Sequence, residues 1–285
     1  RRASIGTFCH EFGHVLGLPD LYDTEYKYYT VSNWSIMCSG NYNNNGRTPP
    51  TYSAYERFFL GWLAPEQLTE KGIYSMEPLQ EANQAYLIAD KTHNLNGGNP
   101  NPSEFFILEY RTKTGWDTYL PGSGMLVWHI DYLASAWYQN TLNDGPDFLR
   151  IHLEEANGIS WNQRKNGENG RTSDPYPGTN NVTSFTPKLH DGTVLSDQNV
   201  LAITDNNTWL SFVYKGLGNI KLSTDVQDIT LTTTISDSRK IVDWEPKPFV
   251  LTAEGLNDSI ITLTTSKGNF LFAVADEAPA YSSKE

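Results

Sequence analysis

The chain has 285 residues, a formal net charge of −12 and two cysteines. This length allows two or three domains with separate cores, and the acidic balance argues against a nucleic-acid-binding surface. Two cysteines exclude a disulfide framework and a cysteine-rich metal module. No apolar run approaches the length that crosses a bilayer. Aromatic residues make up 13% of the chain, which favours a folded, β-rich protein.

The first predicted element is a helix over residues 5–17. With about 100° of rotation per residue, its polar side chains project on one face and its apolar side chains on the other. The polar face carries His10, Glu11 and His14. The apolar stripe on the opposite face consists of Phe8, Phe12 and Val15.

The polar face has the pattern of a zinc site. Two histidines four residues apart on a helix, His10 and His14, can both reach one zinc ion. Glu11 lies beside the position of a zinc-bound water, from which it can take a proton. A catalytic zinc needs a third protein ligand and keeps one position for water. Gly17 allows a sharp turn after the helix, and Asp20 follows where its carboxylate can swing back to the ion.

Other residues compete for the remaining roles. Asp23 could be the third ligand, but a turn residue or a group that orients a ligand suits it better. Glu56, on a second predicted helix over residues 51–63, would be the ligand in a different zincin arrangement. Tyr55 on the same helix could donate to the oxyanion of a tetrahedral intermediate, although its place on an aromatic stripe also fits the core. Asp20 itself could be a simple turn residue after proline.

From about residue 67 the texture of the sequence changes. Short alternating or apolar runs separated by turn signals continue to about residue 216, which predicts a β-sandwich domain of about seven strands. Residues 217–285 are rich in Thr, Ile and Val and are expected to form a small C-terminal β domain. The predicted fold class is therefore α+β and mostly β overall, with the helices and loops in residues 1–66.

Several polar residues outside the motif are also candidates. His129 and Asp131 share one face of a predicted strand and could bind a metal, but a buried histidine hydrogen-bonded to its neighbour is the favoured interpretation. The other three histidines are interpreted as isolated and ordinary: His93, His152 and His190.

Two further features carry weaker hypotheses. Oxygen-bearing side chains in the polar loop 162–181 suggest a possible calcium site, although their spacing is irregular. These side chains belong to Asn169, Asp174, Asn180 and Asn181. Cys9 and Cys38 flank the candidate site and are expected to be free buried thiols, with a disulfide between them as the alternative.

The stretch HEFGHVLGLPDLYD, with SIMCSG downstream, resembles the immune inhibitor A-like M6 metallopeptidases, which are metzincin-type zinc proteases. In this resemblance His10 and His14 match zinc ligands, Glu11 matches the general base and Asp20 the third-ligand position. Met37 matches the methionine of the tight turn beneath the zinc. The similarity runs over roughly residues 3–215 and does not include the C-terminal segment.

The resemblance implies a secreted or cell-surface zinc endopeptidase that hydrolyses proteins through a zinc-bound water activated by Glu11. Residues 1–66 would be the C-terminal half of its catalytic domain. The upstream half, with the edge strand on which a substrate pairs, and a pro-segment are expected outside this chain, which alone would be a poor protease. The alternative is a β-rich extracellular binding or adhesion module that carries an inactive protease remnant.

Overall fold

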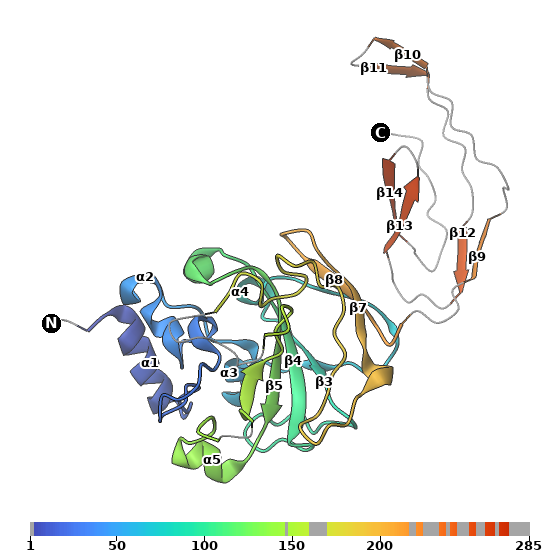
Figure 1. Ribbon diagram of the computed structural model, residues 1–285. Coiled ribbons are helices and arrows are strands. Elements are labelled where there is room, and N and C mark those ends of the chain that lie inside the picture. Colours follow the sequence, from blue (N-terminus) through green and yellow to red (C-terminus); the bar gives the residue numbers. More distant parts are fainter. Residues whose placement is uncertain are drawn as a thin grey trace. The chain divides into compact units, whose positions relative to one another are not determined.

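A computed structural model describes residues 3–145, 148–159 and 170–216, together with six short strands of the C-terminal segment (Figure 1). The chain divides into two compact units, Arg1–Gly216 and Leu217–Glu285, and each is described by itself. Among these residues, none of the helices combines the length and the apolar character that crossing a bilayer requires.

The helices of the first unit are short, and most of them precede the strands of its central sheet in the sequence. The helix α1 (Ile5–Val15) begins at Ser4, whose Oγ accepts a hydrogen bond from the Thr7 amide at 3.3 Å. The helix α3 (Ala54–Phe59) begins at a capping box. The other helices are α2 (Asn43–Gly46), α4 (Leu79–Ala82), α5 (Ala134–Gln139) and the 3₁₀ turns η1 (Ser32–Trp34), η2 (Ser39–Tyr42), η3 (Gly115–Tyr119) and η5 (Ser196–Gln198).

A five-stranded sheet with the order β1-β3-β4-β5-β6 forms the centre of the first unit. Only β1 and β3 run parallel, and the other neighbours are antiparallel. Strands β4 and β5 read as nearly continuous apolar runs because both faces of the sheet are buried. The strands are β1 (Glu66–Gln67), β3 (Tyr86–Ile88), β4 (Glu104–Arg111), β5 (Gly124–Asp131) and β6 (Ile151–Leu153).

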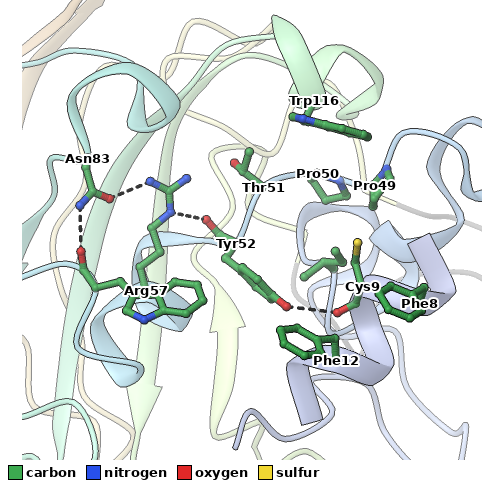
Figure 2. A pocket seen from close by; sticks show the side chains of 12 residues that line it. Phe8, Cys9, Phe12, Pro49, Pro50, Thr51, Tyr52, Arg57, Asn83 and Trp116 are labelled. Atoms are coloured by element: carbon green, nitrogen blue, oxygen red, sulfur yellow. Dashed lines mark hydrogen bonds between the residues drawn. The ribbon is translucent and has the colours of Figure 1, made fainter. Parts of the chain in front are cut away.

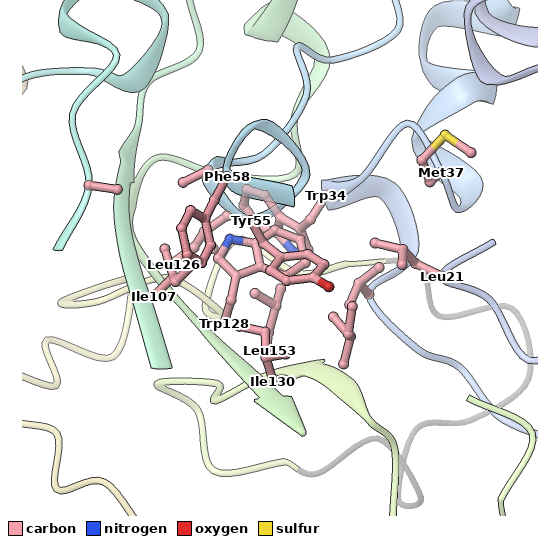
Figure 3. Packing of buried hydrophobic residues seen from close by; sticks show 14 of the residues in the cluster. Leu21, Trp34, Met37, Tyr55, Phe58, Ile107, Leu126, Trp128, Ile130 and Leu153 are labelled. Carbon is pink, nitrogen blue, oxygen red and sulfur yellow. The ribbon is translucent and has the colours of Figure 1, made fainter. Parts of the chain in front are cut away.

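The two faces of this central sheet pack against different partners. On one face, Ile107 and Trp128 join Trp34, Tyr55 and Phe58 of the helical region in one buried cluster (Figure 3). On the other face, alternate residues of the same strands pack against a three-stranded antiparallel sheet. That sheet has the order β2-β8-β7 and consists of β2 (Gly72–Met76), β8 (Leu210–Tyr214) and β7 (Val200–Asp205).

The expected combination of helices and sheets is confirmed, and the chain has an α+β structure. The metzincin-like architecture and the β-sandwich expected over residues 67–216 stay predictions. The boundary expected at residue 66 also stays a prediction. The cluster in Figure 3 does not support it, since it contains residues from both sides of that position.

In the second unit, the described residues form three antiparallel pairs of strands, which are β9 with β12, β10 with β11, and β13 with β14. The small domain expected over residues 217–285 stays a prediction. The strands are β9 (Lys221–Thr224), β10 (Thr234–Asp237), β11 (Lys240–Asp243), β12 (Leu251–Glu254), β13 (Ile260–Thr265) and β14 (Gly268–Ala273).

A buried ionic cluster ties the central sheet to the helical region. Arg111, at the end of β4, is fully buried and contacts Asp117 Oδ1 at 2.8 Å and Glu109 Oε1 at 3.1 Å. Glu109 accepts a hydrogen bond from the Ala54 amide at the start of α3, and Asp117 accepts one from the Thr51 amide at 2.8 Å. Burial lowers the pKa of Arg111, but the two carboxylates outweigh it and raise the pKa, so the guanidinium stays charged.

Replacing one partner of this cluster tests its contribution. We expect Asp117→Ala to lower the free energy of unfolding by about 3–5 kcal/mol, because it leaves a buried guanidinium short of one counter-charge. Urea denaturation measures the loss. The control is Glu25→Ala, which removes an exposed ion pair with Lys27 and should change stability little. Equal losses in the two variants would show that the buried cluster has no special role.

Candidate metal centre

Three side chains of the HExxHxxGxxD motif converge on one point. The Nε2 atoms of His10 and His14 lie 3.2 and 3.1 Å from Asp20 Oδ1. The two imidazole rings stand almost perpendicular, with centroids 4.8 Å apart. His10 and Asp20 are buried, whereas the side chain of His14 is 32% exposed. We call these three residues the ligand trio.

The other nitrogen of each histidine holds the ring in place. His10 Nδ1 donates to the Ile36 carbonyl at 2.9 Å, and His14 Nδ1 donates to the Leu18 carbonyl at 2.8 Å. In the neutral rings, the proton is therefore on Nδ1 and the lone pair on Nε2 points at Asp20. Hydrogen bonds of this kind fix the tautomer and orientation of histidines that bind metals.

Asp20 is held by Asn140, which follows α5. Asn140 Nδ2 donates to Asp20 Oδ2 at 2.6 Å, and the Asp20 amide donates to Asn140 Oδ1 at 2.6 Å. Asp20 Oδ1 is buried and has no hydrogen-bond partner among the residues that the structure describes. Buried polar atoms are normally satisfied. Three acceptor atoms that meet without a donor fit a bound cation, and two imidazoles with one carboxylate fit zinc.

The loop 140–144 also forms hydrogen bonds with the chain before and after Tyr22. Asn143 Nδ2 donates to the Leu21 carbonyl at 2.8 Å, and the Thr24 amide donates to Asp144 Oδ1 at 2.7 Å. The turn that presents Asp20 is therefore fixed by residues about 120 positions away in the sequence.

The charges in the trio are strongly coupled. Burial lowers the pKa of His10, but the contact with Asp20 and the hydrogen bond to Ile36 outweigh it and raise the pKa. Burial raises the pKa of Asp20, but His10 and Asn140 outweigh it and lower the pKa. Either a proton or a metal ion is thus favoured between the two side chains, and the two compete.

Met37 lies directly beneath α1 and is fully buried. A Cβ atom on Gly13 would lie 2.4 Å from Met37 Sδ, so only glycine allows this approach of the helix. Beyond the helix, Gly17 has a φ of +102° and turns the chain toward Asp20. The Leu21 amide then donates to the Met37 carbonyl at 2.8 Å. Met37 therefore supports both the helix and the turn that carry the ligand trio.

Glu11 and Tyr22 lie next to the trio. Glu11 is exposed, and its charge acts on His10. The Tyr22 ring stacks on that of His10 with centroids 6.4 Å apart. Burial and the charge of Asp20 raise the pKa of Tyr22, so its phenol keeps its proton. Tyr22 was not predicted as a site residue from the sequence, although it lies only two positions after Asp20.

Asp23 does not join the trio. Its carboxylate accepts hydrogen bonds from the amides of Glu25, Lys27 and Tyr28 at 2.9, 2.7 and 2.9 Å, and it is buried. These bonds close the loop that follows the motif. Asp23 acts as a turn residue here, and its role in orienting a ligand stays a prediction.

Glu56 and Tyr55 point into the core. Glu56 is fully buried and accepts from Ser35 Oγ at 2.6 Å and from the Ser53 amide. Both of its carboxylate oxygens are therefore occupied. The Tyr55 hydroxyl accepts from Trp137 Nε1 at 2.9 Å, and only 1% of Tyr55 is exposed (Figure 3). The structure favours the core interpretation of Tyr55 over the catalytic one.

The two cysteines are free thiols, with Cys38 buried and Cys9 partly buried. Burial raises the pKa of both, which makes them poor ligands and weak nucleophiles.

The calcium hypothesis finds no support. Asp174 accepts from Trp34 Nε1 at 3.0 Å, from the Arg171 amide at 2.8 Å and from Asn157 Nδ2 at 2.8 Å, so its oxygens are occupied. Asn169 lies outside the described residues.

An apolar groove of about 490 Å³ runs beside α1 (Figure 2). Phe8 and Phe12 of the helix line it together with Trp62 and Trp116. The ligand trio does not line it. Phe8, Phe12 and Val15 are 64%, 49% and 76% exposed. The apolar stripe of the helix is thus left uncovered by the described residues, although such stripes normally face a core.

A family model described as the catalytic domain of the immune inhibitor A peptidase M6 matches residues 1–63. These residues belong to the M6 peptidase family. The match contains the whole ligand trio, Glu11 and Met37. The candidate metal centre therefore lies within the residues that the family model matches, which we call the M6 segment.

Two curated relatives agree with this assignment. The chain is 42% identical over 77 residues to the pre-pro-metalloprotease PrtV of Vibrio cholerae, and 38% identical over 61 residues to immune inhibitor A of Bacillus thuringiensis. These alignments cover 24% and 20% of this chain but only 8% and 9% of the relatives. The M6 relationship therefore indicates a metallopeptidase, while the activity and substrates of the whole protein are matters for proposal.

Substitution of the competing carboxylates distinguishes the possible third ligands. We expect Asp20→Asn to lose the equivalent of zinc that the trio binds, because an amide oxygen carries no charge to hold the ion. Glu56→Gln should keep zinc and lose only stability, because its carboxylate bonds elsewhere. Elemental analysis of the purified variants measures zinc per chain. Zinc lost on Glu56→Gln but kept on Asp20→Asn would reverse the assignment.

Proposed function

We propose that this chain carries the metal centre of a zinc endopeptidase that acts on proteins outside the cell. The observation that supports this best is the meeting of three acceptor atoms, from His10, His14 and Asp20, in a segment of the M6 family. The unsatisfied Asp20 Oδ1 leaves a place for a cation. The extracellular location rests on the resemblance alone.

Each neighbouring side chain has a definite part in peptide hydrolysis. When bound, zinc supplies a Lewis acid that acidifies water and polarises the scissile carbonyl. Glu11 takes the proton of the attacking water and returns it to the leaving amine. Its exposure leaves it free to face a substrate. Asn140 holds Asp20, while the carbonyls of Ile36 and Leu18 hold the two histidines.

The oxyanion that develops during hydrolysis needs a hydrogen-bond donor. Tyr22 suits this role because it lies beside Asp20 and its raised pKa keeps the phenol protonated. Tyr55, the possible donor named from the sequence, would first have to break its bond with Trp137 and leave the core. We therefore favour Tyr22, and the catalytic role of Tyr55 stays an untested prediction.

Substrate binding requires more than the metal centre. The exposed apolar stripe of α1 supports the expectation that this helix packs against a segment outside the described residues. We propose that this partner is the upstream half of the catalytic domain, which would also supply the edge strand for a substrate peptide.

The central test compares zinc content and proteolysis in this chain and in a version extended upstream by about 150 residues, a domain-sized addition. We expect the ligand trio to bind zinc in both versions and the extended version to cleave an unfolded protein substrate. Glu11→Gln in that version should retain zinc and lose activity by about 10²–10⁴-fold, because only the proton transfer is removed.

Other outcomes of that test decide against the proposal. A Glu11→Gln variant with unchanged activity would exclude Glu11 as the general base. If neither version bound zinc at the trio, the endopeptidase proposal would fail. The β-rich binding module with an inactive protease remnant would then be the better description.

A pair of matched substitutions identifies the oxyanion donor. We expect Tyr22→Phe to lower kcat by about 10–10³-fold, because one donor to the developing charge is lost. Tyr55→Phe should leave kcat nearly unchanged and reduce only stability, because its hydroxyl bonds Trp137 in the core. Steady-state kinetics on the extended version measure both effects. The opposite pattern would restore Tyr55 to the catalytic role.

A further inference from the structure

A second group of histidines lies on the other side of the central sheet. His129, His152 and His190 each place a ring nitrogen within 4.8 Å of those of the other two. They come from β5, from β6 and from the loop before β7. We call them the second histidine cluster. It lies in the same unit as the ligand trio but shares no residue with it.

Two interpretations of these residues that the sequence favoured are wrong. His152 and His190 are not isolated. The partner of His129 is not Asp131, because His129 Nδ1 lies 2.8 Å from Glu154 and Nε2 lies 2.9 Å from Glu104. Asp131 instead pairs with Arg150 at 3.0 Å.

Strand register creates the cluster. His129 on β5 is directly opposite His152 on β6, and opposite Phe106 on β4. Side chains in such pairs point to the same face of the sheet. Phe106 packs in the cluster between the two sheets, whereas Trp128 packs against the helical region that carries the ligand trio. The central sheet therefore separates the two histidine groups.

His190 is held in place mainly by ring stacking, and its Nδ1 lies 3.5 Å from carboxylate oxygens of Glu104 and Asp131. Its ring stacks between Phe148 and His129, with centroid distances of 4.1 and 4.3 Å. Both ring nitrogens are buried and have no hydrogen-bond partner among the described residues. Its backbone amide donates to Glu104 at 2.6 Å, which anchors the loop at this position. A buried imidazole whose nitrogens have no hydrogen-bond partner needs an explanation, and a bound metal ion would supply one.

The charges around the cluster also favour a bound cation. Glu104 and Glu154 both face His129, which is only 1% exposed. Arg150 pairs with Asp131 at 3.0 Å, whereas Glu104 and Glu154 lie beside the imidazoles of the cluster. A divalent cation bound by neutral imidazoles would balance both. A carboxylate that accepts from the second nitrogen of a metal-bound histidine is also a recurrent arrangement.

We propose that the second histidine cluster is a metal site for a divalent transition-metal ion of the zinc type. His129, His152 and His190 supply three nitrogen ligands, and one of the two glutamates completes a four-coordinate shell while the other orients His129. Imidazole and carboxylate ligands suit zinc and its first-row neighbours. A shell closed by four protein ligands is typical of structural sites. The ion would thus fasten the loop that carries His190 to strands β5 and β6.

Metal binding by variants of the 285-residue chain tests this site. The chain is stripped with a chelator and titrated with Zn²⁺, and separately with Co²⁺ to give a visible spectrum. We expect His10→Gln/His14→Gln, which removes the trio, to retain one equivalent of metal. Adding His152→Asn/His190→Asn should abolish it. In the trio-deficient variant, metal should raise Tm, because it binds only the folded chain.

The matched control is His93→Asn in the trio-deficient variant. His93 is also buried but belongs to neither group, so its loss should leave the equivalent of metal unchanged. If the quadruple variant does not fold, the single changes His152→Asn and His190→Gln must each alter the Co²⁺ spectrum of the trio-deficient variant.

Two results would overturn the proposal. One is a trio-deficient variant that folds but binds no metal. The other is a metal equivalent whose affinity and Co²⁺ spectrum do not change when His152 and His190 are replaced. Because the trio is absent from these variants, failure of the second site is distinct from failure of the proposed peptidase function.

Discussion

The candidate metal centre depends on the contact between Asp20 and Asn140. Helix α1 alone positions two histidines, but the third acceptor is presented correctly only when the loop 140–144 clamps the turn after the helix. This loop belongs to the β region of the first unit. The HExxHxxGxxD motif therefore depends on the folding of the β region, and a fragment that contained only residues 1–66 would lack the group that holds Asp20.

The locally encoded parts of the site could be predicted from the sequence. His10, Glu11 and His14 follow from helical periodicity, and the glycine and proline that precede Asp20 indicate a turn. Asn140 could not be predicted, because its contact with Asp20 spans 120 residues. Nor does periodicity say which face of a helix becomes buried. The apolar stripe of α1 is exposed to solvent here, while His10 on its polar face is buried.

The β region shows the same limit of sequence reasoning in another form. Alternating runs indicated strands, and helices with sheets were found, but the pairing of strands was not visible in the sequence. His129 and His152 become neighbours only through the register of β5 and β6. Glu104 and His190 arrive from a third strand and a loop. Nearby sequence positions point to Asp131 as the partner of His129, but the carboxylate of Asp131 pairs with Arg150 instead.

The alternation along β5 has a consequence for folding fidelity. Trp128 and Ile130 face one core, and His129 between them faces the other. A slip of one residue against β4 would exchange these faces, forcing an imidazole into an apolar cluster and an indole among carboxylates. The shifted register would be unfavourable on both faces of the sheet, because one face would bury a polar ring and the other would place an apolar ring beside charges. Both cores therefore disfavour the shifted register of β5, and an intermediate with that register would be unstable.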